Sequence, residues 1–334
     1  MSTILVTGGA GYIGSHTLRH LMEAGYGVVV LDDLSAGHRA AVPDGVEILE
    51  VSTDDRPAID KALGDHHPVA VIHFAGSIEA GESMRDPRRF YSNNVVGALN
   101  LADALVEHAA GGPPVPMVFS SSAAVYGEPD VVPINEDAAK EPTNVYGETK
   151  LAFERVLESY SRAYGLRSIS LRYFNACGAA ADGTIGADHR NKTHLITVAM
   201  LVALGRFDAV QVMGEDYPTP DGTCIRDYVH VDDLAAAHVM ALEALFAGSP
   251  TTAYNVGVGH GFSVQQVLDA ADRVVGRPIA RTRAARRAGD PARLIADSSK
   301  IQAELGWRPS YTDLDAMVET AWRWHSTHPD GYGD

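Results

Sequence analysis

The sequence predicts a doubly wound α/β protein, a Rossmann-like parallel sheet covered by helices, with a smaller interleaved α/β substrate domain. Short β-branched runs alternate with longer helical patterns through the first half of the chain, and these short runs are continuously apolar. Such alternation is typical of parallel strands joined by right-handed crossovers. Continuously apolar strands are typical of a sheet with helices on both faces.

The expected strands share β-branched residues and are bounded by Gly, Asp or Ser. They are Ile4–Thr7, Val28–Leu31, Glu47–Val51, Val69–His73, Val115–Ser120 and Ser168–Arg172. One more strand-then-helix unit, Asp227–Leu245, is expected to return to this sheet, with Asp233 as the helix N-cap. Ser263 and Gln266 form a capping-box pattern before an amphipathic run, and Gly276 is placed to end that helix.

Composition excludes several classes of protein. The 334 residues include 27 Lys and Arg against 43 Asp and Glu, a net charge of −16 that repels nucleic-acid backbones and anionic lipids. The two cysteines, Cys177 and Cys224, have no disulfide-framework or metal-site spacing. The longest apolar run, Ile196–Leu204, is far shorter than the roughly 20 residues of a membrane helix. We expect a soluble cytoplasmic protein with no nucleic-acid or membrane partner and no metal.

A glycine-rich turn follows the first expected strand, with Gly8, Gly11 and Gly14 opening a helical pattern. Glycines at these places allow a tight turn, close approach of a pyrophosphate and close helix packing, while the helix N-terminus offers N–H donors. Glycine turns alone are common, but here a second strand also ends at Asp32, eighteen residues after Gly14. An acid there accepts hydrogen bonds from ribose hydroxyls and repels a 2′-phosphate, which predicts NAD rather than NADP.

Tyr146 and Lys150 are four residues apart at the start of a helical run, so they are expected on one helix face. Lowering a tyrosine pKa from about 10 to about 7 requires roughly 4 kcal/mol. A Lys ammonium and the positive nicotinamide of NAD⁺ both favour the phenolate. The alternative is an exposed helix pair without a function.

A serine-rich stretch, Phe119–Gly127, lies at the carboxyl end of an expected strand, where open α/β sheets bind their ligands. The hydroxyl of Ser122 there can hydrogen-bond a substrate oxygen that gains or loses a proton. The alternative is that these serines only begin a loop.

With these residues placed, the chain resembles the extended short-chain dehydrogenase/reductases, and among them the UDP-glucose (or UDP-galactose) 4-epimerase family. The resemblance covers nearly the whole chain. Besides the motifs above, it includes segments 71–76, 91–95, 171–175 and, most specific to the family, Asp221–Val231.

The resemblance implies a role for each matching residue. In the cofactor site, Gly8, Gly11 and Gly14 would form the turn that holds the diphosphate, together with Tyr12 and Ile13. Asp32 would hold the adenosine ribose. The residues lining the rest of the dinucleotide would be Phe74, Asn93, Lys150 and Phe174. In the substrate site, Ser122, Tyr146 and Leu294 would face the sugar, Asn175 the nucleotide sugar, and Arg226 and Arg287 its diphosphate. Gln211–Met213 resembles the segment beside the uracil.

A local reversal of charge supports the diphosphate site. Six arginines and a single acid, Asp290, lie between Arg277 and Arg293 in an otherwise acidic chain. Arginine suits phosphate because its planar guanidinium donates two hydrogen bonds. A solvated basic helix face accounts for most of them, and Arg287, with Arg226 outside this stretch, stays a diphosphate candidate because the resemblance implies it.

Three positions depart from the family pattern. Ser52-Thr53 stands where an Asp-Ile pair often contacts adenine, and Ile78 replaces a lysine often found near the cofactor. Leu294 stands where a bulky tyrosine can occur, so the sugar pocket is expected to admit N-acetylated sugars.

The resemblance implies reversible inversion at C4 of UDP-glucose and UDP-galactose, by transient hydride transfer to tightly bound NAD through a 4-keto sugar. Residues 1–175 with about 224–250 would bind NAD, and about 176–223 with 251–330 would bind the nucleotide sugar. A homodimer would form through helices around Asn94–His108 and Tyr146–Ser161. The alternatives are a 4-epimerase of UDP-N-acetylhexosamine or UDP-glucuronate, and a non-catalytic NAD-binding regulator.

Overall fold

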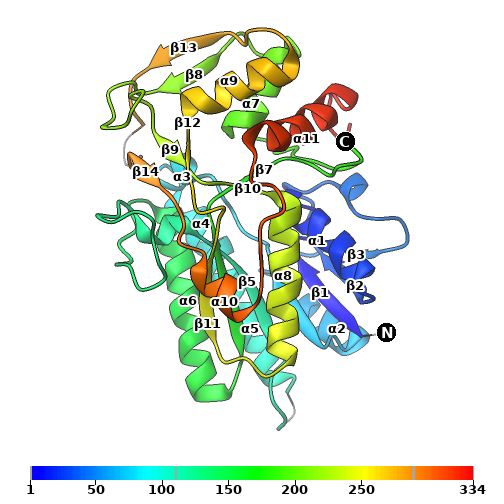
Figure 1. Ribbon diagram of the computed structural model, residues 1–334. Helices are drawn as coiled ribbons and strands as arrows, with labels where there is room; N and C mark the ends of the chain where they lie inside the picture. The colour runs from blue at the N-terminus through cyan, green and yellow to red at the C-terminus, as the bar shows by residue number, and fades with distance from the viewer. Residues whose placement is uncertain (1, 110, 288–289, 334) are drawn as a thin grey trace.

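The central element of the fold is a parallel sheet (Figure 1). The computed structural model describes residues 2–109, 111–287 and 290–333. Within them, seven strands pair in the order β11-β6-β5-β4-β1-β2-β3, every pair parallel. The strands are β1 (Thr3–Thr7), β2 (Gly27–Leu31), β3 (Glu47–Leu49), β4 (Ala70–His73), β5 (Met117–Ser122), β6 (Ser168–Tyr173) and β11 (Thr252–Val256). The predicted doubly wound parallel sheet is confirmed.

Helices cover both faces of this sheet because successive side chains of a strand point to opposite faces. Ile4 of β1 belongs to a core shared with α1 (Tyr12–Glu23), α8 (Val231–Phe246) and α10 (Ser299–Glu304). Its neighbour Leu5 belongs to a second core, shared with the helices of the opposite face. These are α2 (Arg56–His66), α5 (Ala98–Glu107) and α6 (Val145–Tyr164).

A smaller layer of helices and short strands lies beyond the carboxyl ends of the central strands (Figure 1). Helices α7 (Leu195–Ala203), α9 (Val264–Val275) and α11 (Leu314–Thr327) share a separate apolar core there. The short strands are β7 (Asn175–Cys177), β8 (Val210–Met213), β9 (Ile225–Arg226), β10 (Tyr228–His230), β12 (Phe262–Ser263), β13 (Arg281–Ala284) and β14 (Arg293–Leu294). The remaining short helices are η1 (Arg39–Ala41), α3 (Ala80–Ser83), α4 (Pro87–Tyr91), η2 (Ser92–Gly97) and η3 (Ala123–Tyr126).

The strand-then-helix unit Asp227–Leu245 returns to the sheet only in part. Its strand, β10, pairs with β7 outside the central sheet, and only α8 packs on the sheet. The strand that joins the central sheet instead is β11, which pairs with β6. The sequence prediction had assigned residues 251–330, which include β11, to the smaller domain. The apolar side of α8 carries the chain back along the sheet, so the next strand meets the free edge of β6. The division into two domains stays a prediction.

Two local predictions of helix ends have different outcomes. The capping box of α9 is confirmed, with Ser263 and Gln266 bonding reciprocally, and Gly276 ends the helix at φ 78°. The prediction of Asp233 as the N-cap of α8 is wrong, because His230 is the N-cap. The carboxylate of Asp233 instead accepts the N–H groups of Ser310 and Tyr311, at 2.8 and 3.0 Å.

Among the helices of the described residues, none has the length and apolarity needed to span a lipid bilayer.

Candidate functional site

A cavity of about 980 Å³ lies at the carboxyl ends of the central strands. Ligands of open parallel sheets bind at this edge, where neighbouring crossovers leave a crevice. The structure brings most of the predicted site residues to this cavity: Gly8, Gly11, Tyr12, Ile13, Gly14, Asp32, Phe74, Asn93, Ser122, Tyr146, Phe174, Asn175 and Leu294. Three others, Lys150, Arg226 and Arg287, are not among the residues that line it.

The glycine turn leaves space only for hydrogen at two positions. Gly8 has φ +70°, and a Cβ there would lie 2.5 Å from the backbone nitrogen of Ala75. A Cβ at Gly14 would lie 2.3 Å from the carbonyl oxygen of Gly8. The first helical bond of α1 joins the Ser15 N–H to the Gly11 oxygen at 2.9 Å, so the preceding N–H groups have no acceptor within the helix. The turn therefore forms a cradle that fits a pyrophosphate.

Asp32 is buried at the end of β2 and is held by the turn itself. Its carboxylate accepts the N–H groups of Ala10 and Leu34, each at 2.9 Å. Burial raises the pKa of Asp32, and these two hydrogen bonds oppose the rise. The side chain borders the cavity, where its oxygens can accept further hydrogen bonds.

Tyr146 and Lys150 both lie on α6 and both are buried, so the alternative of an exposed helix pair is wrong. The Lys150 Nζ lies 5.8 Å from the centroid of the Tyr146 ring and donates to the Ser120 carbonyl oxygen at 2.9 Å. The Ser122 hydroxyl accepts the Ala124 N–H at 3.1 Å and lies near enough to the Tyr146 hydroxyl to oppose the rise of its pKa. Tyr146 and Ser122 both line the cavity, while Lys150 lies one turn further along α6.

Burial controls the ionisation of both α6 groups. It raises the pKa of Tyr146, and the nearby Ser122 hydroxyl opposes that rise. Burial also lowers the pKa of Lys150 to about 8, with the charge of Glu154 acting in the opposite direction. The protein alone therefore does not depress the phenol pKa, and a base at Tyr146 requires additional positive charge from a bound ligand.

A buried ion pair positions α6 against the sheet, which the sequence analysis missed. Glu154, one turn beyond Lys150, lies 2.6 Å from the guanidinium of Arg172 on β6 and accepts the Ser121 hydroxyl at 2.5 Å. Arg172 also donates to the Tyr126 hydroxyl at 2.9 Å. Since unpaired buried charges are costly, this network holds α6 in one position relative to β5 and β6.

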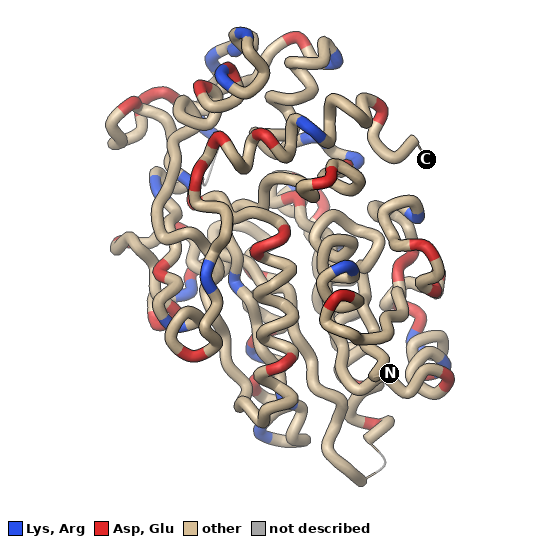
Figure 2. The backbone as a smooth tube through the Cα atoms, turned by 45° about the vertical axis from the view of Figure 1, so that its right-hand side comes forward, with Lys and Arg blue, Asp and Glu red and all other residues tan. Residues whose placement is uncertain are grey.

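The basic stretch does not form a helix face, because Arg281 and Arg283 lie on the strand β13. Most of these arginines have partners within the smaller layer: Arg277 with the Ala203 oxygen, Arg281 with Asp269 and Asp272, Arg283 with Glu215, and Arg286 with Asp216. Figure 2 shows basic and acidic residues next to one another at the top of the molecule. Of the six, this pairing leaves Arg287 and Arg293, and of these two only Arg287 is among the predicted site residues, together with Arg226 on β9.

Arg226 and Arg287 lie in one neighbourhood beside the cavity. Burial raises the pKa of Cys224, and the charges of both arginines oppose that rise. The Arg226 guanidinium lies 3.6 Å from the carboxylate of Asp290, a residue that lines the cavity. An anionic ligand would compete with Asp290 for this guanidinium.

The departures from the family pattern also lie at the cavity. Ser52, Thr53 and Ile78 line it, and so does Asp54 beside them. The Asn93 side chain donates to the Ser77 hydroxyl at 3.1 Å. The contacts expected of an Asp-Ile pair and a lysine are thus replaced by small polar groups, a neighbouring acid and an apolar side chain.

Several residues of the cavity wall carry no sequence motif. The Gly- and Asp-rich segment 176–191 contributes Gly186, Asp188, His189, Arg190 and Asn191. The loop after β2 contributes Ser35 and His38, and the segment after α11 contributes Tyr332. His194, the N-cap of α7, also lines the cavity. Only the loose composition of residues 176–191 could have indicated this wall from the sequence.

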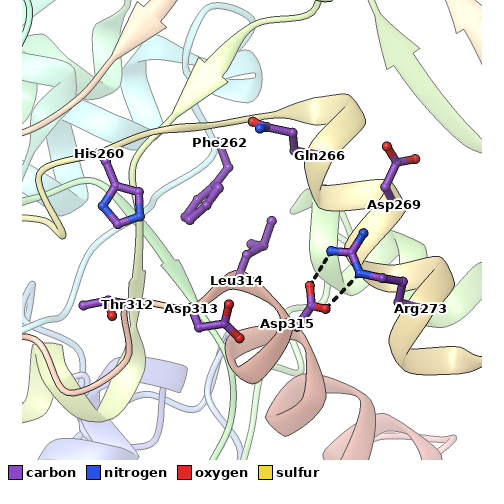
Figure 3. A pocket seen from close by; sticks show the side chains of 9 residues that line it. All are labelled: His260, Phe262, Gln266, Asp269, Arg273, Thr312, Asp313, Leu314 and Asp315. Carbon is purple, nitrogen blue, oxygen red and sulfur yellow. Dashed lines mark hydrogen bonds and ion pairs between the residues drawn. The ribbon is translucent and has the colours of Figure 1, made fainter.

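A second, smaller hollow of about 340 Å³ lies between α9 and α11 (Figure 3). Its polar side chains are engaged locally: Arg273 pairs with Asp315, and Asp313 caps α11 by accepting the Ala316 N–H at 3.0 Å. It contains none of the predicted site residues. No group of three or more His, Cys, Asp or Glu side chains in the described part of the chain is arranged to hold a metal. The larger cavity is therefore the candidate site.

Comparisons with known proteins show which family the chain resembles along its length. Residues 4–257 match the family model of the NAD dependent epimerase/dehydratase family. A UDP-glucose 4-epimerase of Lacticaseibacillus casei is 47% identical over 332 residues, covering 99% of each chain. The Brucella ovis UDP-glucose 4-epimerase, solved in complex with NAD, is 46% identical with a TM-score of 0.92, covering 96% of this chain and 98% of that chain. The Bifidobacterium longum enzyme, solved with NAD⁺ and UDP, is 36% identical with a TM-score of 0.92, covering 99% and 100%.

Proposed function

Because this chain belongs to the NAD dependent epimerase/dehydratase family, we propose that it interconverts UDP-glucose and UDP-galactose by inversion at C4. Similar proteins that match it along nearly their whole length bear the name UDP-glucose 4-epimerase. The observation that carries the proposal is that Tyr146 and Ser122 line the same cavity as the glycine turn and Asp32. One cavity thus presents a proton-transferring pair and a dinucleotide cradle.

The chain offers a site that fits NAD. The glycine turn would hold the diphosphate, Asp32 the adenosine ribose, and Phe74, Asn93 and Phe174 the remainder of the dinucleotide. When bound, NAD would supply positive charge to the site and the capacity to accept a hydride from the sugar C4 and give it back.

Tyr146 is the proposed base, which takes the proton of the sugar 4-hydroxyl and later returns it. Ser122, which lines the cavity near Tyr146, is placed to relay that proton. Lys150 contributes positive charge from the next turn of α6, and Glu154 and Arg172 hold this helix in position.

Inversion requires that the 4-keto sugar turn over while its UDP group stays bound. Arg226 and Arg287 are proposed to grip the diphosphate, and Asn175 the nucleotide sugar. Arg226 is mostly buried and therefore well placed as a fixed anchor, whereas Arg287 is exposed. The sugar side of the cavity is lined by Leu294, an apolar side chain that leaves the hexose free to turn.

The residues after Ser122 argue against dehydration or decarboxylation of the sugar. Related enzymes with those activities usually have acids there, whereas Ala123 and Ala124 begin η3 in this chain. No acid or base for C5 or C6 chemistry is therefore supplied from this segment.

Purified protein should convert UDP-galactose to UDP-glucose without added NAD. NMR of the sugar resonances measures this conversion. Protein that carries NAD but converts no UDP-hexose would favour the non-catalytic regulator instead. Conversion of UDP-glucuronate or UDP-N-acetylhexosamines alone would assign the substrate to a related 4-epimerase.

Replacing Asp32 with Asn is expected to weaken NAD binding about 10-fold or more and to reduce the preference for NAD over NADP. Hydrogen bonds to a charged group contribute about 1.5–3 kcal/mol, and the neutral amide no longer repels a 2′-phosphate. Calorimetric titration with both dinucleotides measures the change. Glu50→Gln removes a carboxylate from an exposed ion pair with Arg39 nearby and should leave both affinities unchanged. Equal preference for NAD in the Asp32 variant and the wild type would refute this role.

Leu294→Tyr is expected to lower kcat/KM for UDP-N-acetylgalactosamine at least about 10-fold while UDP-galactose turnover is largely kept. Leu294 packs beside Phe174 at the cavity wall, so a larger ring there fills the space proposed for the N-acetyl group. Leu294→Met, which keeps the side-chain volume nearly constant, is the control. An unchanged ratio of the two substrates in the tyrosine variant would contradict the proposal.

We also propose that the enzyme is a cytoplasmic homodimer. Both cysteines are free and buried, which suits a reducing compartment. The exposed apolar side chains of Val96 on η2 and Tyr164 on α6 support an interface along the helices predicted from the sequence. Sedimentation equilibrium should give the mass of two chains, and a single-chain mass at micromolar concentration would contradict the dimer.

A further inference from the structure

Three segments far apart in the sequence meet at the end of the cavity that contains Asp32. They are the loop after β2, the segment 186–191, and the segment 328–333 that follows α11. Each contributes residues to the cavity wall: Ser35, Gly37 and His38, then Gly186 and Asp188, then Tyr332. The wall of this end therefore depends on how the three segments are held together.

Asp188 lies at the centre of this junction. Its carboxylate accepts the backbone N–H of Tyr332 at 3.0 Å and also the ammonium of Lys192. The His38 Nε2 donates to the Asp188 carbonyl oxygen at 2.7 Å. Burial alone would raise the pKa of Asp188, but the hydrogen bonds from Lys192 and the Tyr332 N–H outweigh it and lower the pKa. Asp188 is therefore a partly buried, ionised link between all three segments.

Tyr332 adds a second set of contacts. Its hydroxyl accepts the Gly186 N–H at 3.1 Å and donates to the Gly186 carbonyl oxygen at 3.2 Å. Its ring lies 5.0 Å from the His38 ring and 4.7 Å from the Trp324 ring, measured between centroids. The side chain thus bridges the cavity wall and helix α11.

The preceding residue fits this place only as glycine. Gly331 has φ +69°, and a Cβ there would lie 2.0 Å from the Asp188 carboxylate. Gly333, two residues on, has a similar φ of +78° but nothing within 4 Å of its Cβ position. The two glycines therefore share a backbone strain on substitution and differ in their contact with Asp188.

We propose that the 328–333 segment, through Gly331, Tyr332 and Asp188, closes the adenosine end of the cavity and slows the release of NAD. The inference rests on the proposed function, in which the cofactor returns to its oxidised state within each turnover and need not leave. Opening this end requires breaking the hydrogen bonds of Asp188 and Tyr332. The segment therefore controls cofactor retention, and Tyr332 is a positioning residue that takes no part in the chemical step.

The test measures NAD release from loaded enzyme. Protein saturated with NAD is diluted into an excess of an alcohol dehydrogenase and its alcohol, which convert released NAD to NADH absorbing at 340 nm. Gly331→Ala and Tyr332→Ala should each release NAD about 10-fold faster than wild type, because lost contacts act mainly on the off-rate. Gly333→Ala should release it within about twofold of the wild-type rate. Turnover of UDP-galactose by the first two variants should fall without added NAD and recover when NAD is added.

The outcomes separate this inference from the function on which it rests. Wild-type protein that never retains NAD would contradict the proposed function. If the wild type retains NAD, and folded Gly331→Ala and Tyr332→Ala release it at the wild-type rate, the role of the segment is overturned. Tyr332→Phe keeps the ring and removes the hydroxyl that bonds to Gly186, so it remains informative if the alanine variants do not fold. Release at the wild-type rate from Tyr332→Phe and from whichever alanine variant folds would likewise overturn the inference.

Discussion

Tyr146→Phe should lower kcat about 10²–10⁴-fold while NAD stays bound, because the change removes only the hydroxyl that transfers the proton. The hydroxyl lies near Ser122, and the buried ring that lines the cavity is retained. Conversion of UDP-galactose followed by NMR gives the rate, and the absorbance of NAD released by acid gives the cofactor content. Loss of turnover together with retained NAD would separate a chemical role from a binding role.

Tyr160→Phe is the matched control, since Tyr160 lies on the same helix and its hydroxyl donates to Asp103 at 2.6 Å, away from the cavity. This variant should keep kcat within about twofold. Tyr146→Phe with wild-type turnover would remove the basis of the proposed mechanism, because no other group has been assigned as the base that takes that proton.

Gly14→Ala should weaken NAD binding by about 10–100-fold and lower the melting temperature. The added Cβ would meet the Gly8 oxygen at 2.3 Å and the Gly9 Cα at 2.8 Å. Both are backbone atoms of the turn and cannot rotate away, so α1 or the turn has to move. Overpacking of this kind costs about 1–3 kcal/mol, which corresponds to the stated range of affinity if the cradle is distorted. Calorimetric titration of NAD and thermal unfolding measure the two effects.

Gly64→Ala controls for the glycine-to-alanine change itself. Gly64 lies within α2 with nothing within 4 Å of its Cβ position, so alanine should stabilise the protein by about 0.5–1 kcal/mol through its helix preference. Gly14→Ala is therefore expected to lower the free energy of unfolding, and Gly64→Ala is expected to raise it. Wild-type NAD affinity in Gly14→Ala would show that the turn is not the pyrophosphate cradle.

The predictions that the structure confirms depend on local patterns. The capping box of Ser263 and Gln266 closes over three residues, and the apolar runs of the central strands report burial on both faces of a sheet. The glycines of the turn are informative because a tight turn and close packing exclude side chains wherever the chain lies. Such signals depend on the nearest neighbours in sequence and survive without knowledge of the rest of the fold.

The predictions that failed required knowledge of distant partners. Asp233 has the sequence context of an N-cap, but it binds the backbone of Ser310 and Tyr311, more than seventy residues away. The strand after Asp227 pairs with β7, and β11 takes the place expected for it. Pattern alone does not distinguish these choices, because several apolar strands could complete the same sheet edge.

By itself, the sequence determined the class of sheet, the glycine turn before α1, and the presence of Tyr146 and Lys150 on one helix. Only the tertiary structure decided that burial raises the pKa of Tyr146 and that Glu154 and Arg172 fix its helix. It also decided that Tyr332 lies against His38 in the cavity wall. The physical reason is that desolvation and long-range hydrogen bonds depend on which segments the folded chain brings together. Local periodicity predicts only that a side chain is buried, and the residues that it contacts depend on the tertiary fold.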